Sequence, residues 1–249
     1  MNLISICDGA NVSGFVAKKL GINQAAFIDK NLIKFQSLTG NSKAMELLED
    51  WRQINEQLDI AYFRQPKLQL SPIRESEYDK YYFKELFRFM DIKKPKWVVW
   101  EMHPDIIQSW QGRVFREIIG NITSIGYGVS WRVFDSSLFE SPIKSEKLIM
   151  VCHLGSWEQT RSVLFEEESS IGYFKIKERD GQKSPTISED NRAIEVTPEM
   201  ILMANNLPKN YLSKIPKEKR AKVAKNASNA LLVEFILSRI KLLTVLVEK

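Results

Sequence analysis

Cysteine and histidine are scarce in this chain, which has two of each among 249 residues. The two cysteines, Cys7 and Cys152, are too few for a disulfide framework or a structural zinc site, and they favour reduced thiols in a cytosolic compartment. Long apolar runs are also missing, because the most apolar stretch, 231–247, is interrupted by three charged residues and makes a poor membrane span. The first residues lack the pattern of a secretory signal. We therefore expect a cytoplasmic protein with no membrane partner and no metal site.

The rest of the composition is that of a globular domain. Hydrophobic residues make up 44% and charged residues 27% of a chain that is long enough to form one large core. Lysine and arginine outnumber the acidic residues by 36 to 31, which gives a net charge of +5. This excess permits binding to nucleic acid but does not demand it, because many basic proteins bind none.

Short apolar runs alternate with segments of helical periodicity along most of the chain. Strands are expected at 3–7, 25–29, 60–63, 96–101, 127–134 and 147–152, and helices at 13–20, 30–39, 45–57, 78–90 and 113–125. This alternation predicts an α/β fold with a mostly parallel sheet and helices on both faces. We expect three parts: a core at 1–154, a small polar insertion at 155–192, and a helical segment at 193–249 that completes the core.

The first expected strand ends at a turn that reads Asp-Gly-Ala-Asn-Val-Ser-Gly at 8–14 and leads into a helix. Such a turn places backbone N–H groups and a helix N-terminus beside a nucleotide-like ligand. Strand–glycine–helix turns are also common for purely steric reasons. On its own the pattern is therefore weak evidence for a ligand.

Residues 6–22 resemble, in length and register, the first motif of the DNA cytosine-5 methyltransferases, whose glycine-rich loop holds S-adenosylmethionine. The Gly-x-Gly-Gly of that family reads Gly-Ala-Asn-Val here, at 9–12. Segments 196–199 and 207–211 follow the family's Leu-Thr-x-x-Glu and Phe-Pro-x-x-Tyr, and 225–228 stands at its Gly-Asn-Ala-Val. The resemblance implies a Rossmann-like methyltransferase fold across nearly the whole chain.

The resemblance also implies which residues would hold the cofactor. They come from the first turn, the end of the second strand and the approach to the last helix: Asp8, Gly9, Asn11, Asp29 and Asn226. The acid with which the family grips the cofactor ribose is replaced by Phe27, whose ring cannot accept a hydrogen bond from a hydroxyl. Given this replacement and the altered loop, we expect that no cofactor is bound.

The nucleophile is the second departure from the family. The family carries Pro-Cys-Gln after the third expected strand, and its thiolate attacks C6 of the flipped cytosine. Here the chain reads Arg-Gln-Pro-Lys-Leu-Gln-Leu-Ser at 64–71, so that Lys67 falls on the cysteine. An ordinary ammonium group is protonated near neutral pH and needs strong burial to become nucleophilic. We therefore expect no catalytic residue at this position.

The apolar strand at 96–101 ends on a carboxylate, Glu101. The resemblance places Glu101 at the glutamate that contacts the cytosine ring in the family. The sequence leaves a second interpretation open, in which this carboxylate caps the helix expected to start at Pro104.

Basic residues supply the candidate nucleic-acid contacts. In the family a turn reads Gly-x-Pro-Gln-x-Arg-x-Arg, and residues 142–147 stand there with Lys144 and Lys147 as the remaining cations. A second basic cluster follows near the C-terminus, and the candidates from all three places are Lys67, Lys144, Lys147, Lys214, Lys217, Lys219, Arg220 and Lys222. Lysines can neutralise phosphates. The cluster is equally typical of a solvated helix face.

These observations favour a catalytically inactive relative of the cytosine-5 methyltransferases that binds DNA or an active partner subunit. Two other classes stay open. One is an S-adenosylmethionine-dependent methyltransferase or base-modifying enzyme that works without the usual thiol, and this class would need the cofactor. The other is a regulator or decoy that binds protein rather than nucleic acid.

Overall fold

The computed structural model describes residues 1–29, 43–45, 48–65, 77–165 and 196–247. Its strands are β1 (Asn2–Ile6), β2 (Asn23–Ile28), β3 (Lys43–Met45), β4 (Ile60–Arg64), β5 (Trp97–Met102), β6 (Tyr127–Asp135) and β7 (Glu146–Leu154). The α-helices are α1 (Val12–Lys19), α2 (Glu77–Lys93), α3 (Arg113–Ser124), α4 (Trp157–Leu164), α5 (Pro198–Ala204), α6 (Lys217–Lys225) and α7 (Ala230–Val247). Four 3-10 helices complete the described elements: η3 (Leu48–Gln53), η4 (Pro104–Ile107), η5 (Ser109–Gly112) and η6 (Ser136–Phe139).

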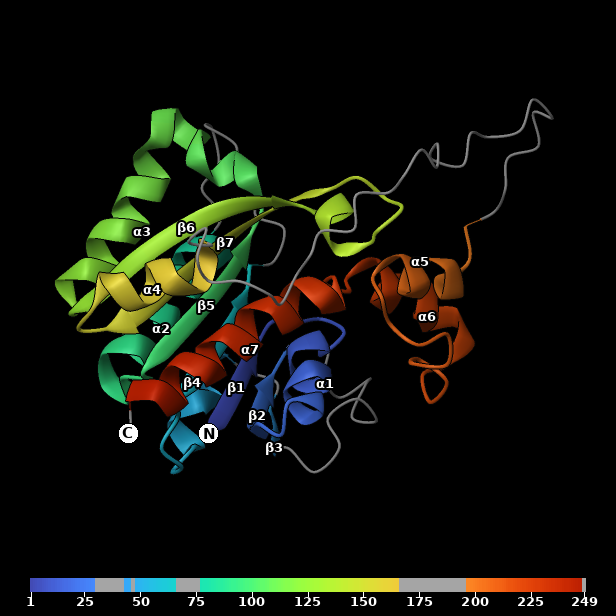
Figure 1. The fold of residues 1–249 in the computed structure, drawn as a ribbon, viewed down its shortest axis with the longest axis horizontal. Coiled ribbons are helices and arrows are strands. Elements are labelled where there is room, and N and C mark those ends of the chain that lie inside the picture. Colours follow the sequence, from blue (N-terminus) through green and yellow to red (C-terminus); the bar gives the residue numbers. More distant parts are fainter. Residues whose placement is uncertain (30–42, 46–47, 66–76, 166–195, 248–249) are drawn as a thin grey trace.

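The strands form one sheet of seven in the order β3-β2-β1-β4-β5-β7-β6 (Figure 1). The first five in this order are parallel, and β7 runs antiparallel to both of its neighbours. The chain builds outward from β1 through β2 to β3 and then returns to place β4 on the other side of β1. The carboxyl ends of β1 and β4 therefore form a topological switch point, where open α/β sheets bind their ligands.

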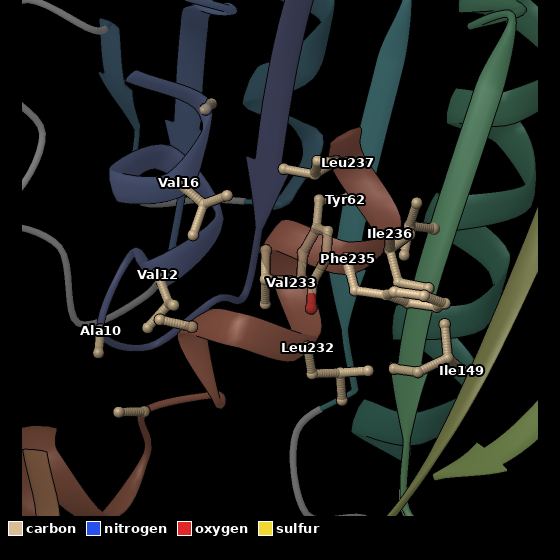
Figure 2. Packing of buried hydrophobic residues seen from close by; sticks show 14 of the residues in the cluster. Ala10, Val12, Val16, Tyr62, Ile149, Leu232, Val233, Phe235, Ile236 and Leu237 are labelled. Atoms are coloured by element: carbon tan, nitrogen blue, oxygen red, sulfur yellow. The ribbon is translucent and has the colours of Figure 1, made fainter. Parts of the chain in front are cut away.

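Each face of the sheet carries its own hydrophobic core. On one face α2, α3 and η3 cover strand residues that include Phe63, Trp100 and Cys152. On the other face α1, α4 and α7 cover the alternate strand residues. Figure 2 shows side chains of α7 meeting Val12 and Val16 on one side and Tyr62 and Ile149 on the other. This two-sided burial is the α/β arrangement that the sequence predicts.

The last helix, α7, is mainly a core element. Seven of its apolar side chains are buried: Ala230, Leu232, Val233, Phe235, Ile236, Leu237 and Ile240. Packing against the core is thus confirmed for this helix, although Leu242, Val245 and Leu246 remain exposed on its last turns. No helix in the described part of the chain has the length and apolarity to cross a membrane.

The expected elements agree with the structure except around 45–57. There the structure has β3 and then the short 3-10 helix η3 instead of an α-helix. Trp51 of η3 is buried, as are Met45 at the end of β3 and Ile54 directly after η3. The helix expected at 30–39 lies outside the described residues.

The segment expected as a polar insertion, 155–192, begins with the core helix α4. Val163 and Leu164 are fully buried, and the C-terminal carbonyls of this helix accept hydrogen bonds from two arginines. Arg132 donates to Leu164 O at 3.0 Å, and Arg239 donates to Ser162 O at 2.7 Å. Cations at a helix C-terminus stabilise it through the helix dipole. The remaining residues of the expected insertion, 166–192, lie outside the described part.

Candidate functional site at the ends of β1, β4 and β5

A buried polar cluster lies at the switch point between β1 and β4. Asp8 lies two residues after the end of β1, Arg64 ends β4, and Glu101 lies one residue before the end of β5. Register brings the last two together, because Arg64 pairs with Glu101 across β4 and β5. The carboxyl ends of parallel strands meet at one edge of a sheet, so three separate segments deliver charged side chains to the same place.

Glu101 is the centre of this cluster. Its side chain is only 2% exposed, and Oε2 accepts hydrogen bonds from Tyr62 Oη at 2.8 Å and from Ser228 Oγ at 2.6 Å. These contacts exclude the interpretation of Glu101 as a helix cap. The cap of η4 is His103, whose Nδ1 accepts from the backbone N–H of Asp105 at 3.3 Å.

Two cations face the other oxygen of Glu101. Arg64 Nε lies 3.4 Å and Lys147 Nζ 3.9 Å from Oε1. Burial alone would raise the pKa of Glu101. The charges of Arg64 and Lys147, with the hydrogen bonds from Ser228 and Tyr62, outweigh it and hold the pKa below its ordinary value. Glu101 is therefore a carboxylate at neutral pH.

Asp8 is the second buried carboxyl group, and its environment differs. Oδ2 accepts from Ser13 N at 2.7 Å and from Ser13 Oγ at 2.6 Å, which caps the start of α1. Among the described residues, Oδ1 has no hydrogen-bond partner. Burial is the main cause that raises the pKa of Asp8 to about 7, against the opposing effects of Ser13 and Arg64. Asp8 therefore changes its protonation near neutral pH.

The five residues expected to hold a cofactor do lie around the first turn. Gly9 N donates to Asp29 Oδ2 at 3.0 Å, and Asn11 Nδ2 donates to Gln24 Oε1 at 3.2 Å. A Cβ placed on Gly9, whose φ is +50°, would lie 3.1 Å from Asn226 Cβ. Phe27 is buried within β2, where the family's acid would stand. The five residues therefore lie near one another at the first turn.

The basic residues expected to contact nucleic acid fall into three groups. Lys144, Lys214, Lys217 and Lys222 are exposed. Lys147 faces Glu101, and Arg220 donates to Ile215 O and Ser213 O at 2.8 Å, while Lys219 is half-buried. Lys67 lies outside the described residues.

Sequence reasoning missed three members of the cluster around Glu101: Tyr62, Arg64 and Ser228. The first two could have been found, since alternation along β4 puts them on the same face of the sheet. Ser228 gave no comparable signal, because only the fold brings it from a distant segment to Glu101. Thr197 caps α5, where its hydroxyl oxygen accepts a hydrogen bond from Met200 N at 3.3 Å.

Comparisons with solved structures define the class of fold. A DNMT2 mutant from Spodoptera frugiperda superposes with a TM-score of 0.68 at 10% identity, over 96% of this chain and 99% of that one. A putative DNA modification methyltransferase from an Escherichia coli prophage gives 0.68 at 10%, over 97% and 98%. The Entamoeba histolytica methyltransferase EhMeth gives 0.65 at 12%, over 96% and 97%. At these identities the likeness establishes a methyltransferase fold and no more.

The sequence itself identifies the family to which the chain belongs. The model of the C-5 cytosine-specific DNA methylases matches residues 74–230, which is more than half of the chain. The chain therefore belongs to the C-5 cytosine-specific DNA methylase family. The match includes Glu101 and Ser228 and begins after the first turn and Lys67. None of the curated protein sequences gives a significant match.

The family depends on S-adenosylmethionine, so the first turn can be tested for a fit to that group. The turn gives its donors to protein: Gly9 N to Asp29, Asn11 N to Asp8 O at 2.9 Å, and Ser13 N to Asp8. Ala10, Asn11 and Val12 are buried by the chain itself. Gly9 is only half-buried, and its neighbours Asp29 and Asn226 are the positions that the resemblance assigns to the cofactor, so binding of S-adenosylmethionine is consistent with this turn.

The raised pKa of Asp8 predicts a pH-dependent stability. A group whose pKa is higher in the folded state contributes its full stabilisation at pH values below its unfolded-state pKa. That contribution is lost as the pH rises through the folded-state pKa, which is about 7 for Asp8. The free energy of unfolding should fall by about 2–3 kcal/mol from about pH 5 to about pH 8 because of Asp8. Urea titrations of Asp8→Asn should lack this part of the fall, since asparagine does not ionise.

The matched control is Asp91→Asn, which removes an exposed carboxyl group of α2. This variant should keep the pH dependence of the unaltered protein. An Asp8→Asn profile that parallels the unaltered one across this range would show that Asp8 is not a neutral-pH titrating group.

Proposed function

We propose that this chain is a member of the C-5 cytosine-specific DNA methylase family that does not methylate cytosine and that acts by binding DNA, alone or together with an active partner subunit. Cytosine-5 chemistry needs a thiolate beside the base, and the chain has only two thiols to offer. The observation that carries the proposal is the position of these two thiols relative to Glu101.

Both cysteines belong to the opposite side of the sheet from the Glu101 carboxylate. Cys152 is fully buried in the middle of β7 and packs with Val98 and Trp100 under α2 and α3. Burial raises the pKa of its thiol far above the ordinary value, so the thiolate is suppressed. Cys7 packs against the same core. Glu101 points to the other face, where it meets Tyr62 and Ser228.

The sequence around the family's cysteine supports the same conclusion. Lys67 stands there, and a protonated ammonium cannot form the covalent bond to C6 that the family's reaction requires. Removing a covalent nucleophile typically costs about 10⁶ in rate, or roughly 8 kcal/mol of barrier. Such a loss is enough to abolish turnover.

Binding to DNA is supported by the exposed face of α6. Val223 and Ala224 anchor this helix, and Lys217, Lys222 and Lys225 point to solvent. Exposed lysines on one short helix can follow a phosphate backbone as point charges, with counterion release supplying the affinity. Such contacts recognise the charge of the DNA backbone rather than the base sequence.

Methyl transfer tests the first half of the proposal. The purified protein, incubated with tritiated S-adenosylmethionine and DNA or RNA, should incorporate no label above a heat-treated sample. Cys7→Ser and Cys152→Ser should behave as the unaltered protein does. Incorporation that disappears in either serine variant would refute the assignment. Incorporation that persists in both would identify an enzyme that works without a thiol.

Salt-dependent DNA binding tests the second half. Log affinity should fall linearly with log salt, and Lys217→Ala/Lys222→Ala/Lys225→Ala should reduce the slope by about 0.9 for each phosphate that the variant no longer neutralises. The control, Lys18→Ala/Lys84→Ala/Arg116→Ala, removes three exposed cations from α1, α2 and α3. Gel shifts over a salt series measure both. Equal slopes for the two variants would contradict a role for α6, and no binding at low salt would favour a protein-binding regulator.

A further inference from the structure

One buried acceptor atom at the switch point is left without a donor. Glu101 is 2% exposed, and its Oε2 already accepts from the hydroxyl groups of Tyr62 and Ser228. Its other oxygen, Oε1, is buried and has no hydrogen-bond partner among the residues that the structure describes. A buried acceptor in this state costs free energy, and a ligand that brings a donor would satisfy it.

Two cationic donors flank this oxygen. Arg64 Nε lies 3.4 Å and Lys147 Nζ 3.9 Å from Oε1, and neither makes a hydrogen bond to it. Because β5 lies between β4 and β7 in the sheet, the two cations reach Glu101 from opposite neighbouring strands. The three side chains therefore present a row of donor, acceptor and donor at the edge where open α/β sheets bind their ligands.

This row is complementary to the imide edge of a pyrimidine. Uracil and thymine present a carbonyl, a ring N–H and a second carbonyl, so that N3–H can donate to Glu101 while Arg64 and Lys147 donate to the carbonyl oxygens. Cytosine presents a carbonyl, the lone pair of N3 and an amino group. Its N3 would face the carboxylate oxygen acceptor to acceptor, and its amino group would meet a cation.

The charge state of Glu101 strengthens this discrimination. Burial raises its pKa, but Arg64, Lys147 and the two hydroxyl groups outweigh burial and hold the pKa below its ordinary value. At neutral pH the carboxyl group therefore has no proton to donate to N3 of cytosine. As a carboxylate it can only accept, which is what a ring N–H requires.

The row borders the surface through its cations. The side chains of Arg64 and Lys147 are 15% and 29% exposed, against 2% for Glu101. The ammonium group of a lysine is a compact charge on a flexible stem. Lys147 can therefore move aside for an entering ring and then donate to it.

We propose that Arg64, Glu101 and Lys147 form a site for the imide edge of a base, which takes uracil or thymine and rejects cytosine. The inference rests on the proposed function, because it names the kind of base that this DNA-binding chain would hold. It requires no methyl transfer.

Ligand-observed NMR titrations of the full chain with nucleoside monophosphates test the site. 2′-Deoxyuridine and thymidine 5′-monophosphates should bind about tenfold more tightly than 2′-deoxycytidine 5′-monophosphate, and the tighter of the two identifies the base. N3-methyl-2′-deoxyuridine 5′-monophosphate keeps both carbonyls and loses the N–H, so it should bind about tenfold more weakly than its unmethylated parent. No S-adenosylmethionine is present, so the result is separate from that of the methyl-transfer assay.

Glu101→Gln is the variant that tests the carboxylate. A glutamine can turn either its carbonyl or its amino group toward the base, so the preference over cytosine should fall to about one. The matched control is Glu117→Gln, at an exposed position of α3, which should keep the preference of the unaltered protein.

Three results with the unaltered protein would overturn the proposal: equal or tighter binding of the cytosine nucleotide, no loss of affinity on N3 methylation, or no binding of any of these nucleotides at millimolar concentration. None of them depends on whether Glu101→Gln folds. A folded Glu101→Gln variant that retains the full preference would overturn it as well.

Discussion

Burial of the Glu101 carboxylate is the constraint on which this site depends. A carboxylate taken out of water loses several kcal/mol of solvation unless charges and hydrogen bonds replace it. Here the replacements come from four places: Tyr62 and Arg64 on β4, Lys147 on β7, and Ser228 before α7. Because these elements are far apart in the sequence, the carboxylate can remain ionised while buried only when the sheet and the C-terminal segment have assembled around it.

Glu101 and Asp8, two of the buried carboxyl groups, show how the surroundings set the protonation of each. Glu101 has two cations and two hydroxyl groups, which keep it charged, while Asp8 has Ser13 and a more distant Arg64, which do not offset its burial. A family glutamate that contacts a base must be free to do so. In this chain Oε2 of Glu101 is held by Tyr62 and Ser228, whereas Oε1 faces Arg64 and Lys147 and has no hydrogen-bond partner among the described residues.

The sheet and most of its helices could be predicted because hydrophobic periodicity is a local property. The runs at β1, β4 and β5 are apolar on both faces, as buried parallel strands require. The region 45–57 misled because a short window of apolar residues does not separate an α-helix from a strand followed by a 3-10 helix. The residues that the resemblance assigns to the cofactor lie close together, because β1 and β2 are parallel neighbours and their carboxyl ends meet.

The contacts around Glu101 and the contact of Tyr211 with the first turn could not be predicted, because both join distant segments. Tyr211 meets Ala10 across a separation of 201 residues, and Ser228 meets Glu101 across 127. Nothing local to a tyrosine or a serine shows which carbonyl or carboxylate it will reach. The resemblance to the family supplied the fold but not these contacts.

The central proposal is that no thiol of this chain reaches a base held beside Glu101. Incubation with S-adenosylmethionine and an oligonucleotide that contains 5-fluorocytosine tests it most directly, because fluorine at C5 traps the covalent adduct between a cysteine and C6. We expect mass spectrometry to find no covalent complex between protein and DNA. An adduct located at Cys7 or Cys152 would contradict the proposal.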